Sequence, residues 1–340
     1  MINNTSRLPD PPNVIKAIRS GFDAITNHIG LVGFPVCLDV LLWFAPHLRI
    51  KGQIERLLSE MNSISSLLSA DFQEMIQVSQ GIWTEAAGRI NLLAALRSYP
   101  VGVFSLMTSI LPIEHPLGRP LFVEIQRPQT ALLIAAGFFV IGVGLGGLYF
   151  GAVRQAALYD LIQWRTLIPQ WPRFTAQSLL LSGIFFVFFL GLLILGSCAA
   201  TGVALISITM GQAVVLLFGV MAFWLIFPLF FSPHGIFIKN LTAGRSLLNS
   251  LQLTSLTFFR TGIFIMIALL VTQGLTLLWQ VSPEDSWLMV ISILGHGFVS
   301  TGMLAASFVY YQDMNRWVNE LRTIRKAEFA CEDKNGNNNS

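Results

Sequence analysis

Charged side chains are scarce in this sequence of 340 residues: Asp, Glu, Lys and Arg together make up 11% of it, and none occurs between Phe174 and Ile238. In soluble proteins about a quarter of the residues are charged. Because an apolar helix of about 20 residues crosses the hydrocarbon core of a bilayer, the charge-free stretch is long enough for two crossings joined by a turn. The composition excludes an ordinary soluble protein and predicts a chain embedded in a membrane.

Cysteine and recognisable catalytic motifs are also sparse. The three cysteines, Cys37, Cys198 and Cys331, have neither a metal-ligand spacing nor an obvious disulfide partner. The sequence contains no Gly-x-Ser-x-Gly or His-Glu-x-x-His motif and no phosphate-binding loop. The net charge is only +3 and the basic residues are scattered, which argues against a nucleic-acid surface. We therefore expect no catalytic residues, no metal site, no cofactor and no nucleic-acid partner.

Long apolar runs are present, and they predict an all-α, polytopic transmembrane bundle with about six spans. The expected spans are residues 29–46, 129–152, 178–201, 211–231, 261–281 and 287–311. The first span follows a cytoplasmic segment, residues 1–28, and the other five lie together in residues 129–311. A tail, residues 312–340, is expected to be disordered at its Asn-rich end, residues 335–339.

Basic residues in the connections predict the orientation of the chain, because Lys and Arg accumulate on the cytoplasmic side of short loops. With six spans, the basic N-terminal segment, second connection, fourth connection and tail all fall on one side. The third and fifth connections, which carry no Lys or Arg, fall on the other side. The sequence therefore predicts an integral, multi-pass protein of the cell membrane with both termini in the cytoplasm.

The connection between the first two spans, residues 47–128, is much longer than the others and is expected to form an extracytoplasmic helical cap. Apolar residues recur in it at intervals of three and four, which predicts one face of a long amphipathic helix. That face consists of Ile54, Leu57, Leu58, Met61, Ile64, Leu67, Leu68, Phe72, Met75 and Ile76. It either packs against a second amphipathic stretch, residues 83–96, and the tops of the spans, or lies on the outer membrane surface.

Three connections on the cytoplasmic side share one pattern: residues 14–27, 159–177 and 237–259 each mix apolar and basic residues and then lead directly into a span. We expect each to form an interfacial helix. Trp and Arg are favoured at the headgroup level, where an apolar body and a polar tip are both satisfied. The expected anchors are Trp164, Trp171, Arg173, Arg245 and Arg260.

The last of these connections carries a family resemblance. Its sequence Ala243-Gly-Arg-Ser-Leu-Leu-Asn-Ser-Leu-Gln-Leu, followed by Phe258-Phe-Arg and an apolar helix, resembles the interfacial-helix pattern of uncharacterised bacterial six-span membrane proteins. It is also similar to the membrane domain attached to some glycerophosphodiester phosphodiesterases, over roughly residues 149–312. The catalytic pattern of those enzymes, a His-Arg-Gly followed by paired carboxylates, has no match in this sequence. The resemblance therefore implies the membrane architecture without the catalytic domain.

Two ionisable residues fall inside the expected spans, Asp39 in the first and His296 in the sixth. Ionisable groups within a bilayer usually face the interior of the bundle and often mark ion or proton pathways. Because imidazole titrates near neutral pH, His296 is able to exchange a proton with Asp39 if the two meet. The alternative is that hydroxyl groups, or a backbone carbonyl exposed by Pro35, satisfy each of them.

Glycines recur four residues apart in the second span, as the pairs Gly142 with Gly146 and Gly147 with Gly151. This spacing allows two helix backbones to approach closely in lipid. Packing within the chain is favoured over a homodimer, because most helix faces in a six-span bundle already have internal neighbours.

Together these features favour a non-enzymatic membrane protein that acts by binding, as a scaffold, an assembly factor or an accessory subunit. Membrane lipids are its expected partners, and another membrane protein is a further candidate. The alternative is a proton- or cation-coupled transporter that uses Asp39, alone or with His296. An enzyme acting on lipid is a third hypothesis.

Overall fold

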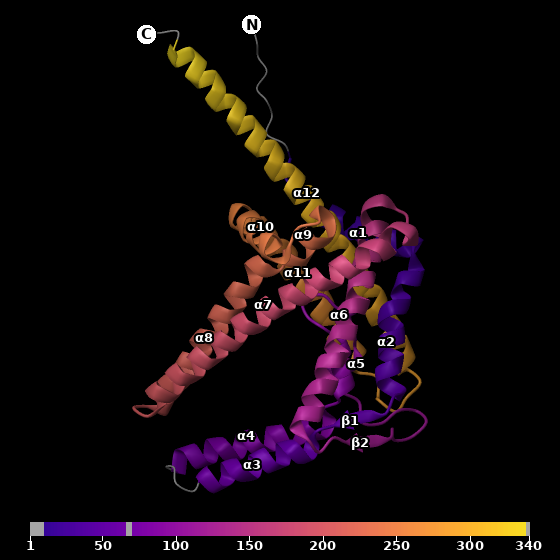
Figure 1. The fold of residues 1–340 in the computed structure, drawn as a ribbon, viewed down its shortest axis with the longest axis vertical. Helices are drawn as coiled ribbons and strands as arrows, with labels where there is room; N and C mark the ends of the chain where they lie inside the picture. The colour runs from indigo at the N-terminus through magenta and orange to yellow at the C-terminus, as the bar shows by residue number, and fades with distance from the viewer. Residues whose placement is uncertain (1–9, 66–69, 338–340) are drawn as a thin grey trace.

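The computed structural model describes residues 10–65 and 70–337 of the chain, and these residues are almost entirely helical (Figure 1). Within them, five helical segments are long and apolar enough to cross a membrane. A sixth crossing is formed if two consecutive helical pieces that meet at a bend, Val14–Asn27 and Ile29–Phe44, count as one span. The protein is thus an all-α, multi-pass membrane protein, as the apolar runs predict.

The membrane helices and their neighbours begin and end as follows. They are α1 (Val14–Asn27), η1 (Ile29–Val32), α2 (Gly33–Phe44), α6 (Pro128–Tyr159), α7 (Trp164–Ala204), α8 (Ile208–Leu229), α9 (Ser232–Lys239), α10 (Ala243–Leu256), α11 (Phe258–Trp279) and α12 (Met289–Asn337). The region between α2 and α6 contains β1 (His47–Arg49), α3 (Lys51–Ser65), α4 (Ala70–Arg89), η2 (Leu92–Leu96), α5 (Met107–Ile110) and β2 (Phe122–Glu124).

The bundle has two distinct ends (Figure 1). Helices α1, α9 and α10 lie at one end, beyond which the last part of α12 projects, and we call it the termini end. Strands β1 and β2 and helices α3 and α4 lie at the opposite end, the cap end. The basic connections that the sequence places on one side of the membrane, between α6 and α7 and between α9 and α11, lie at the termini end.

Helix α12 forms the centre of the bundle and packs against α1, α2, α6 and α11. Its contact with α1 is close, because a Cβ added to Gly21 would lie 2.3 Å from the backbone nitrogen of Ala306. Tyr149 of α6 is fully buried and donates a hydrogen bond to Oγ1 of Thr301 at 2.9 Å. These contacts make α12 the most buried of the candidate spans.

Helices α7 and α8 leave the bundle as a pair and diverge from α6 and α12 toward the cap end (Figure 1). We call residues 186–226 of this hairpin the arm. The arm is covered with exposed apolar side chains, including Phe186, Leu195 and Leu216. Near the termini end the base of the hairpin packs against α9 and α10.

The cap end contains a short parallel pair of strands and a helical hairpin. His47 of β1 pairs with Phe122 of β2, and α3 packs against α4. Some apolar residues of this hairpin, including Leu57, Met61 and Trp83, are exposed. The side chains of Ile64, Leu67, Leu68, Phe72, Met75 and Ile76 lie outside the part of the chain that the structure describes.

Glu284, in the connection between α11 and α12, ties this connection to the cap. Its carboxylate accepts hydrogen bonds from Arg89 and from the backbone nitrogen of Ile113, both at 2.9 Å, and its carbonyl accepts one from Trp43 at 3.0 Å. The base of the cap is therefore attached to the connection between α11 and α12, and this connection is in turn bonded to α2 through Trp43.

Helices α1 and α10 form where two of the three interfacial helices are expected, but residues 159–177 do not form a separate helix. Instead α7 runs without interruption from Trp164 to Ala204, with Pro169 and Pro172 inside it. A proline inside a helix removes a backbone donor and crowds the preceding turn. In membrane helices it is tolerated where neighbouring helices or polar side chains satisfy the backbone groups that it frees. The first span also differs from the expected residues 29–46, because α1 and the following helix meet at a bend of 93°.

The tail, residues 312–340, also differs from the predicted disorder at its end. Helix α12 continues to Asn337, through most of the segment whose composition predicts disorder. Extending an existing helix adds one hydrogen bond for each residue that is fixed, which is easier than nucleating a new helix. Residues 1–9 and 338–340, which belong to the expected terminal segments, lie outside the described chain.

Candidate functional site

The segment of residues 91–110 does not stay in the cap but enters the membrane bundle beside α6. A Cβ added to Gly142 would lie 2.2 Å from the carbonyl oxygen of Leu96, and one added to Gly146 would lie 2.6 Å from Cα of Gly102. These two glycines lie 14 and 18 residues after Pro128, which corresponds to about 21 and 27 Å along the helix. We call residues 91–110 the re-entrant segment.

The two glycine pairs of α6 therefore have different partners. Gly142 contacts the backbone of Leu96 at the end of the short 3-10 helix η2, and Gly146 contacts the non-helical backbone at Gly102, whereas the sequence predicts a second membrane helix there. Gly147 and Gly151 face α7, where their added Cβ atoms would lie 3.2 Å from Oγ1 of Thr175 and 2.5 Å from Cδ1 of Leu167. Both pairs pack within this chain, and only the second joins two membrane helices.

Asp39 is fully buried on α2, and its carboxylate holds the re-entrant segment. Oδ1 accepts hydrogen bonds from Oγ of Ser105 at 2.5 Å and from the backbone nitrogen of Met107 at 3.1 Å. Oδ2 accepts one from the backbone nitrogen of Leu106 at 3.1 Å. Because Leu106 and Met107 begin α5, the carboxylate satisfies free N–H groups at a helix N-terminus. Three donors thus fix this acid in place.

His296 of α12 lies beside Asp39, so the structure brings the two ionisable residues together. Its Nδ1 is 3.9 Å from Oδ2 of Asp39, beyond hydrogen-bond distance. Its Nε2 is 3.3 Å from Oγ of Ser300, one turn further along α12. His296 is 8% exposed and lies seven residues after the start of α12, at a depth of about 10 Å along that helix.

Arg97 completes the polar cluster from the re-entrant segment itself. Its guanidinium donates a hydrogen bond to Oγ1 of Thr108 at 3.2 Å, and its positive charge interacts electrostatically with both Asp39 and His296. Unlike those two residues, Arg97 is exposed on the surface of the segment. Irregular backbone at membrane depth is tolerated only where protein buries it or where it lines a water-filled cavity. Here α6 and the carboxylate of Asp39 cover the backbone of the segment from the side of the bundle.

The cluster supports two kinds of chemistry. As an anchor, Asp39 joins the re-entrant segment to α2 through hydrogen bonds. As a proton site, the carboxylate and the imidazole are close enough to exchange a proton after a small movement of either side chain. The three hydrogen bonds to Asp39 favour the anchoring role, since an exchange would compete with them.

The expected interfacial anchors occupy different environments. Trp164 and Arg245 are exposed near the termini end, and Arg260 stacks over the ring of Trp317 with its Cζ 5.3 Å from the centroid. Trp171 instead donates from Nε1 to the carbonyl of Gly144 at 2.7 Å, and Arg173 donates to the carbonyl of Asn240 at 2.5 Å. The last two residues therefore connect parts of the protein to one another.

Sequence reasoning missed Ser105, Arg97 and the re-entrant segment as a whole. One signal was available: residues 91–111 contain a single charged residue, Arg97, and are rich in Leu, Ala and Val. Pro100 divides this stretch into pieces that are too short to be recognised as a span. The interaction of Asp39 with this segment joins residues 66 to 68 positions apart, a separation that local patterns do not reveal.

Comparisons with known proteins do not identify a family for this chain. No protein-family model, curated protein or solved structure matches the chain. The resemblance to six-span membrane proteins and to the membrane domain of some phosphodiesterases therefore stays a prediction. Among the residues that the structure describes, no group of three or more His, Cys, Asp or Glu side chains is placed to hold a metal ion.

Proposed function

We propose that this protein is a non-enzymatic scaffold, assembly factor or accessory subunit that binds another membrane protein through the arm. The observation that carries the proposal is the contrast in burial between the arm and the bundle. In the most apolar 18-residue stretch of the segment Ile208–Lys239, which contains α8, only 6% of the residues are buried. In the corresponding stretch of α12, 67% of the residues are buried. The arm is thus a pair of apolar helices whose outer surface is open to contacts in the membrane.

The physics of membranes supports a protein partner for such a surface. Helices associate in lipid through close packing, since lipid already surrounds apolar side chains and supplies no hydrophobic driving force between them. The arm presents several helical glycines, among them Gly191, Gly202 and Gly219, where an added Cβ would meet no described atom within 4 Å. These positions leave space for close approach by a helix from another protein. In this proposal the termini end faces the cytoplasm, as the basic connections indicate.

Site-specific crosslinking in the native membrane tests the proposal. A photoreactive amino acid replaces Leu216 of the arm in one variant and Leu270 of α11 in the other, which are 70% and 66% exposed. After illumination, the protein is purified in mild detergent and its adducts are identified by mass spectrometry. We expect a stoichiometric protein adduct from position 216 and only lipid adducts from position 270.

A pair of polar substitutions provides the matched control for this experiment. Leu216→Asn is expected to reduce the amount of the co-purified partner about tenfold, corresponding to about 1.4 kcal/mol of binding free energy. Leu270→Asn makes the same chemical change on the bundle and is expected to leave the partner bound. Equal retention in both variants, or lipid adducts alone from both positions, would contradict a binding role for the arm.

Proton- or cation-coupled transport is the second candidate, because Nδ1 of His296 lies 3.9 Å from the carboxylate of Asp39 next to a re-entrant segment. Proteoliposomes that contain a pH-sensitive dye test it. If transport occurs here, Asp39→Asn and His296→Gln each abolish proton flux, and His296→Gln does so while keeping the melting temperature of the unmodified protein. Flux that is unchanged in His296→Gln would remove the proton pair as the coupling site.

A further inference from the structure

An apolar groove of about 600 Å³ lies between α2 and α6. Phe34 and Cys37 belong to its α2 wall, Ile141 and Leu145 belong to its α6 wall, and Leu96 of the re-entrant segment also lines it. Ile141 is 53% exposed, and Leu145 and Cys37 are exposed as well, so the groove opens to the outside of the bundle. Its volume falls within the range of about 300–1,000 Å³ that is typical of ligand-binding pockets.

Two glycines leave this groove open. Gly30 and Gly33 both line it, and a Cβ added to either would meet no described atom within 4 Å. The backbone of Gly33 has φ of −57° and ψ of −31°, an ordinary helical conformation that any residue adopts. The conformation therefore does not require glycine at this position. What glycine provides is space, since a larger side chain would fill the groove.

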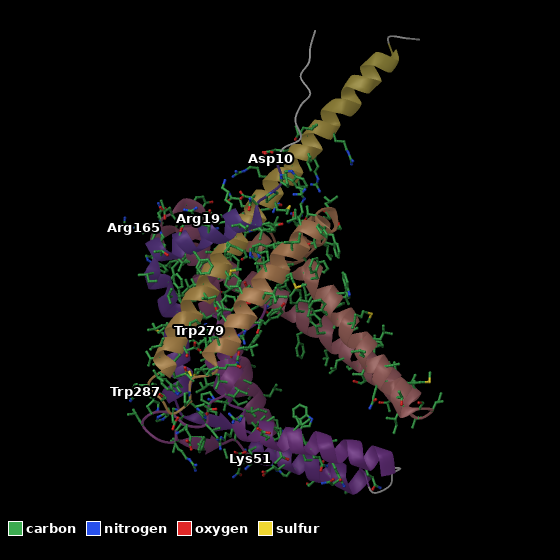
Figure 2. All side chains as sticks on the ribbon, turned by 180° about the vertical axis from the view of Figure 1, so that it is seen from behind. Asp10, Arg19, Lys51, Arg165, Trp279 and Trp287 are labelled. Carbon is green, nitrogen blue, oxygen red and sulfur yellow. The ribbon has the colours of Figure 1, made fainter. Side chains whose placement is uncertain are left out.

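The termini end of the groove is polar. His28, two residues before Gly30, has its Nε2 3.3 Å from Oδ1 of Asp160, which also accepts a hydrogen bond from Asn27 at 3.3 Å. The side chain of Asp160 is 70% exposed, so it can bind a further cationic group. Arg165 lies at the same end of the molecule, as Figure 2 shows, and it supplies a positive charge. A negative and a positive group are thus available at the headgroup level.

This arrangement matches the parts of one kind of lipid. The apolar walls at membrane depth suit a hydrocarbon chain, which has no polar groups to satisfy. A primary amine would interact with the carboxylate of Asp160, and a phosphate with the guanidinium of Arg165. We infer that the groove binds an acyl chain of a phosphatidylethanolamine molecule from the leaflet at the termini end, with its headgroup at Asp160 and Arg165. This site is separate from the arm and does not depend on a protein partner.

Photolabelling of the full-length protein tests the inference. The protein is reconstituted into vesicles of phosphatidylcholine that contain a small fraction of phosphatidylethanolamine with a diazirine on one acyl chain. Labelled residues are then mapped by mass spectrometry. We expect the label to concentrate on the groove residues of α2 and α6. Labelling spread evenly over all lipid-facing helices would overturn the inference.

Substitutions that fill the groove make the test specific. Gly33→Leu is expected to lower the groove labelling about tenfold, which corresponds to about 1.4 kcal/mol of binding free energy. The matched control is Gly274→Leu on α11, where an added Cβ also meets no described atom within 4 Å. Ile141→Trp fills the groove from its other wall and serves as a second variant if Gly33→Leu does not fold. Groove labelling that persists in a folded groove variant, or falls equally in the control, would contradict the proposed site.

The headgroup is tested separately with Asp160→Asn. Asp160 has a φ of 50°, a left-handed conformation that Asn tolerates well, so the backbone is expected to be preserved. With its carboxylate removed, the protein should lose its preference for the diazirine-labelled phosphatidylethanolamine over a phosphatidylglycerol probe with the same acyl chain. A preference that is unchanged in Asp160→Asn, or absent from the unmodified protein, would overturn the assignment of the headgroup.

Discussion

Helix α12 and the arm are both apolar and both long enough to cross a membrane, yet their surroundings are opposite. The most apolar window of α12 has a mean hydropathy of 1.6 and is 67% buried, whereas that of the α8 segment has a mean hydropathy of 2.6 and is 6% buried. The less hydrophobic helix is thus the more buried one. In a membrane the solvent is itself apolar, so polar side chains collect in the interior, where they find hydrogen-bond partners.

The buried residues of α12 illustrate this rule. His296, Ser300, Thr301 and Ser307 are all buried, and each forms a hydrogen bond with another group of the protein. On the arm, the large exposed side chains are mainly Leu, Phe, Val and Ile. Four measurements test this contrast between the bundle and the arm, and they follow in order of decreasing effect.

The largest effect is expected from filling a close backbone contact of the bundle. Gly146→Leu would force a side chain against Cα of Gly102, only 2.6 Å from the position of the new Cβ. We expect it to destabilise the protein by about 3 kcal/mol or to prevent folding. Gly219→Leu on the arm, where the new Cβ meets no described atom within 4 Å, should change little. Thermal unfolding in detergent measures the stability of both variants. A similar loss of stability in the two would refute the contrast between the bundle and the arm.

Removing the carboxylate of Asp39 should have the next largest effect. Asp39→Ala leaves the buried backbone N–H groups of Leu106 and Met107 without their acceptor. An unsatisfied buried donor costs about 1–3 kcal/mol, so a loss of about 2–3 kcal/mol is expected. Thr201→Ala, at an exposed position near the end of the arm, should lie within about 0.5 kcal/mol of the unmodified protein. Denaturant unfolding compares them, and equal midpoints would argue against the anchoring role of Asp39.

A single interior hydrogen bond should give a smaller effect. Tyr149→Phe and Thr301→Val each remove one side of the 2.9 Å bond between α6 and α12. A double-mutant cycle that combines them is expected to give a coupling free energy of about 1 kcal/mol. A coupling near zero would mean that this hydrogen bond between α6 and α12 adds no stability to the bundle. That result would contradict a stabilising role for buried polar side chains in the interior.

The smallest effect is expected at the cap end, where water again becomes the solvent. His47 of β1 is buried, and burial is the main cause that lowers its pKa below the ordinary value of 6.5, with a further contribution from the charge of Arg49. The unfolded chain therefore takes up a proton at a higher pH than the folded cap does. Stability contributed by this residue is present above about pH 6.5 and is lost as the pH falls below it.

Hydrogen exchange of the β1 amides between pH 7 and pH 5 measures this loss, after correction for the intrinsic exchange rate. The reduction in protection at low pH should be smaller in His47→Gln, which cannot take up the proton. His115 also acts electrostatically on His47, so His115→Gln serves as a second variant that shifts the dependence without removing it. An identical pH dependence in the unmodified protein and in His47→Gln would exclude His47 as its source.

Much of the fold could be predicted from the sequence because crossing a membrane is a local property. The charge-free stretch of residues 174–238 requires two helices whatever surrounds them. The same applies to α6, α11 and α12, whose expected spans all overlap the observed helices. Helices α1 and α10 were recognisable as separate elements from their mixture of apolar and basic residues before a span. The unbroken course of α7 was not, because proline signals a boundary in most sequences.

The candidate site was only partly predictable. The sequence alone singles out Asp39 and His296, because an ionisable residue within an apolar run is conspicuous. Their partners Ser105 and Arg97 lie in an ordinary-looking stretch of the long connection. Nothing local distinguishes a connection that stays outside the membrane from one that enters it.

The sequence by itself determined that this protein is a helical, multi-pass membrane protein, how its crossings are ordered and which ionisable residues lie within them. These properties depend on the transfer of short stretches from water to lipid, which composition alone governs. Only the tertiary structure decided that residues 91–110 re-enter the bundle, that Asp39 holds them there and that the arm stands apart from α12. These properties depend on hydrogen bonds and close contacts between residues that are distant in the chain, which appear only once the helices have assembled.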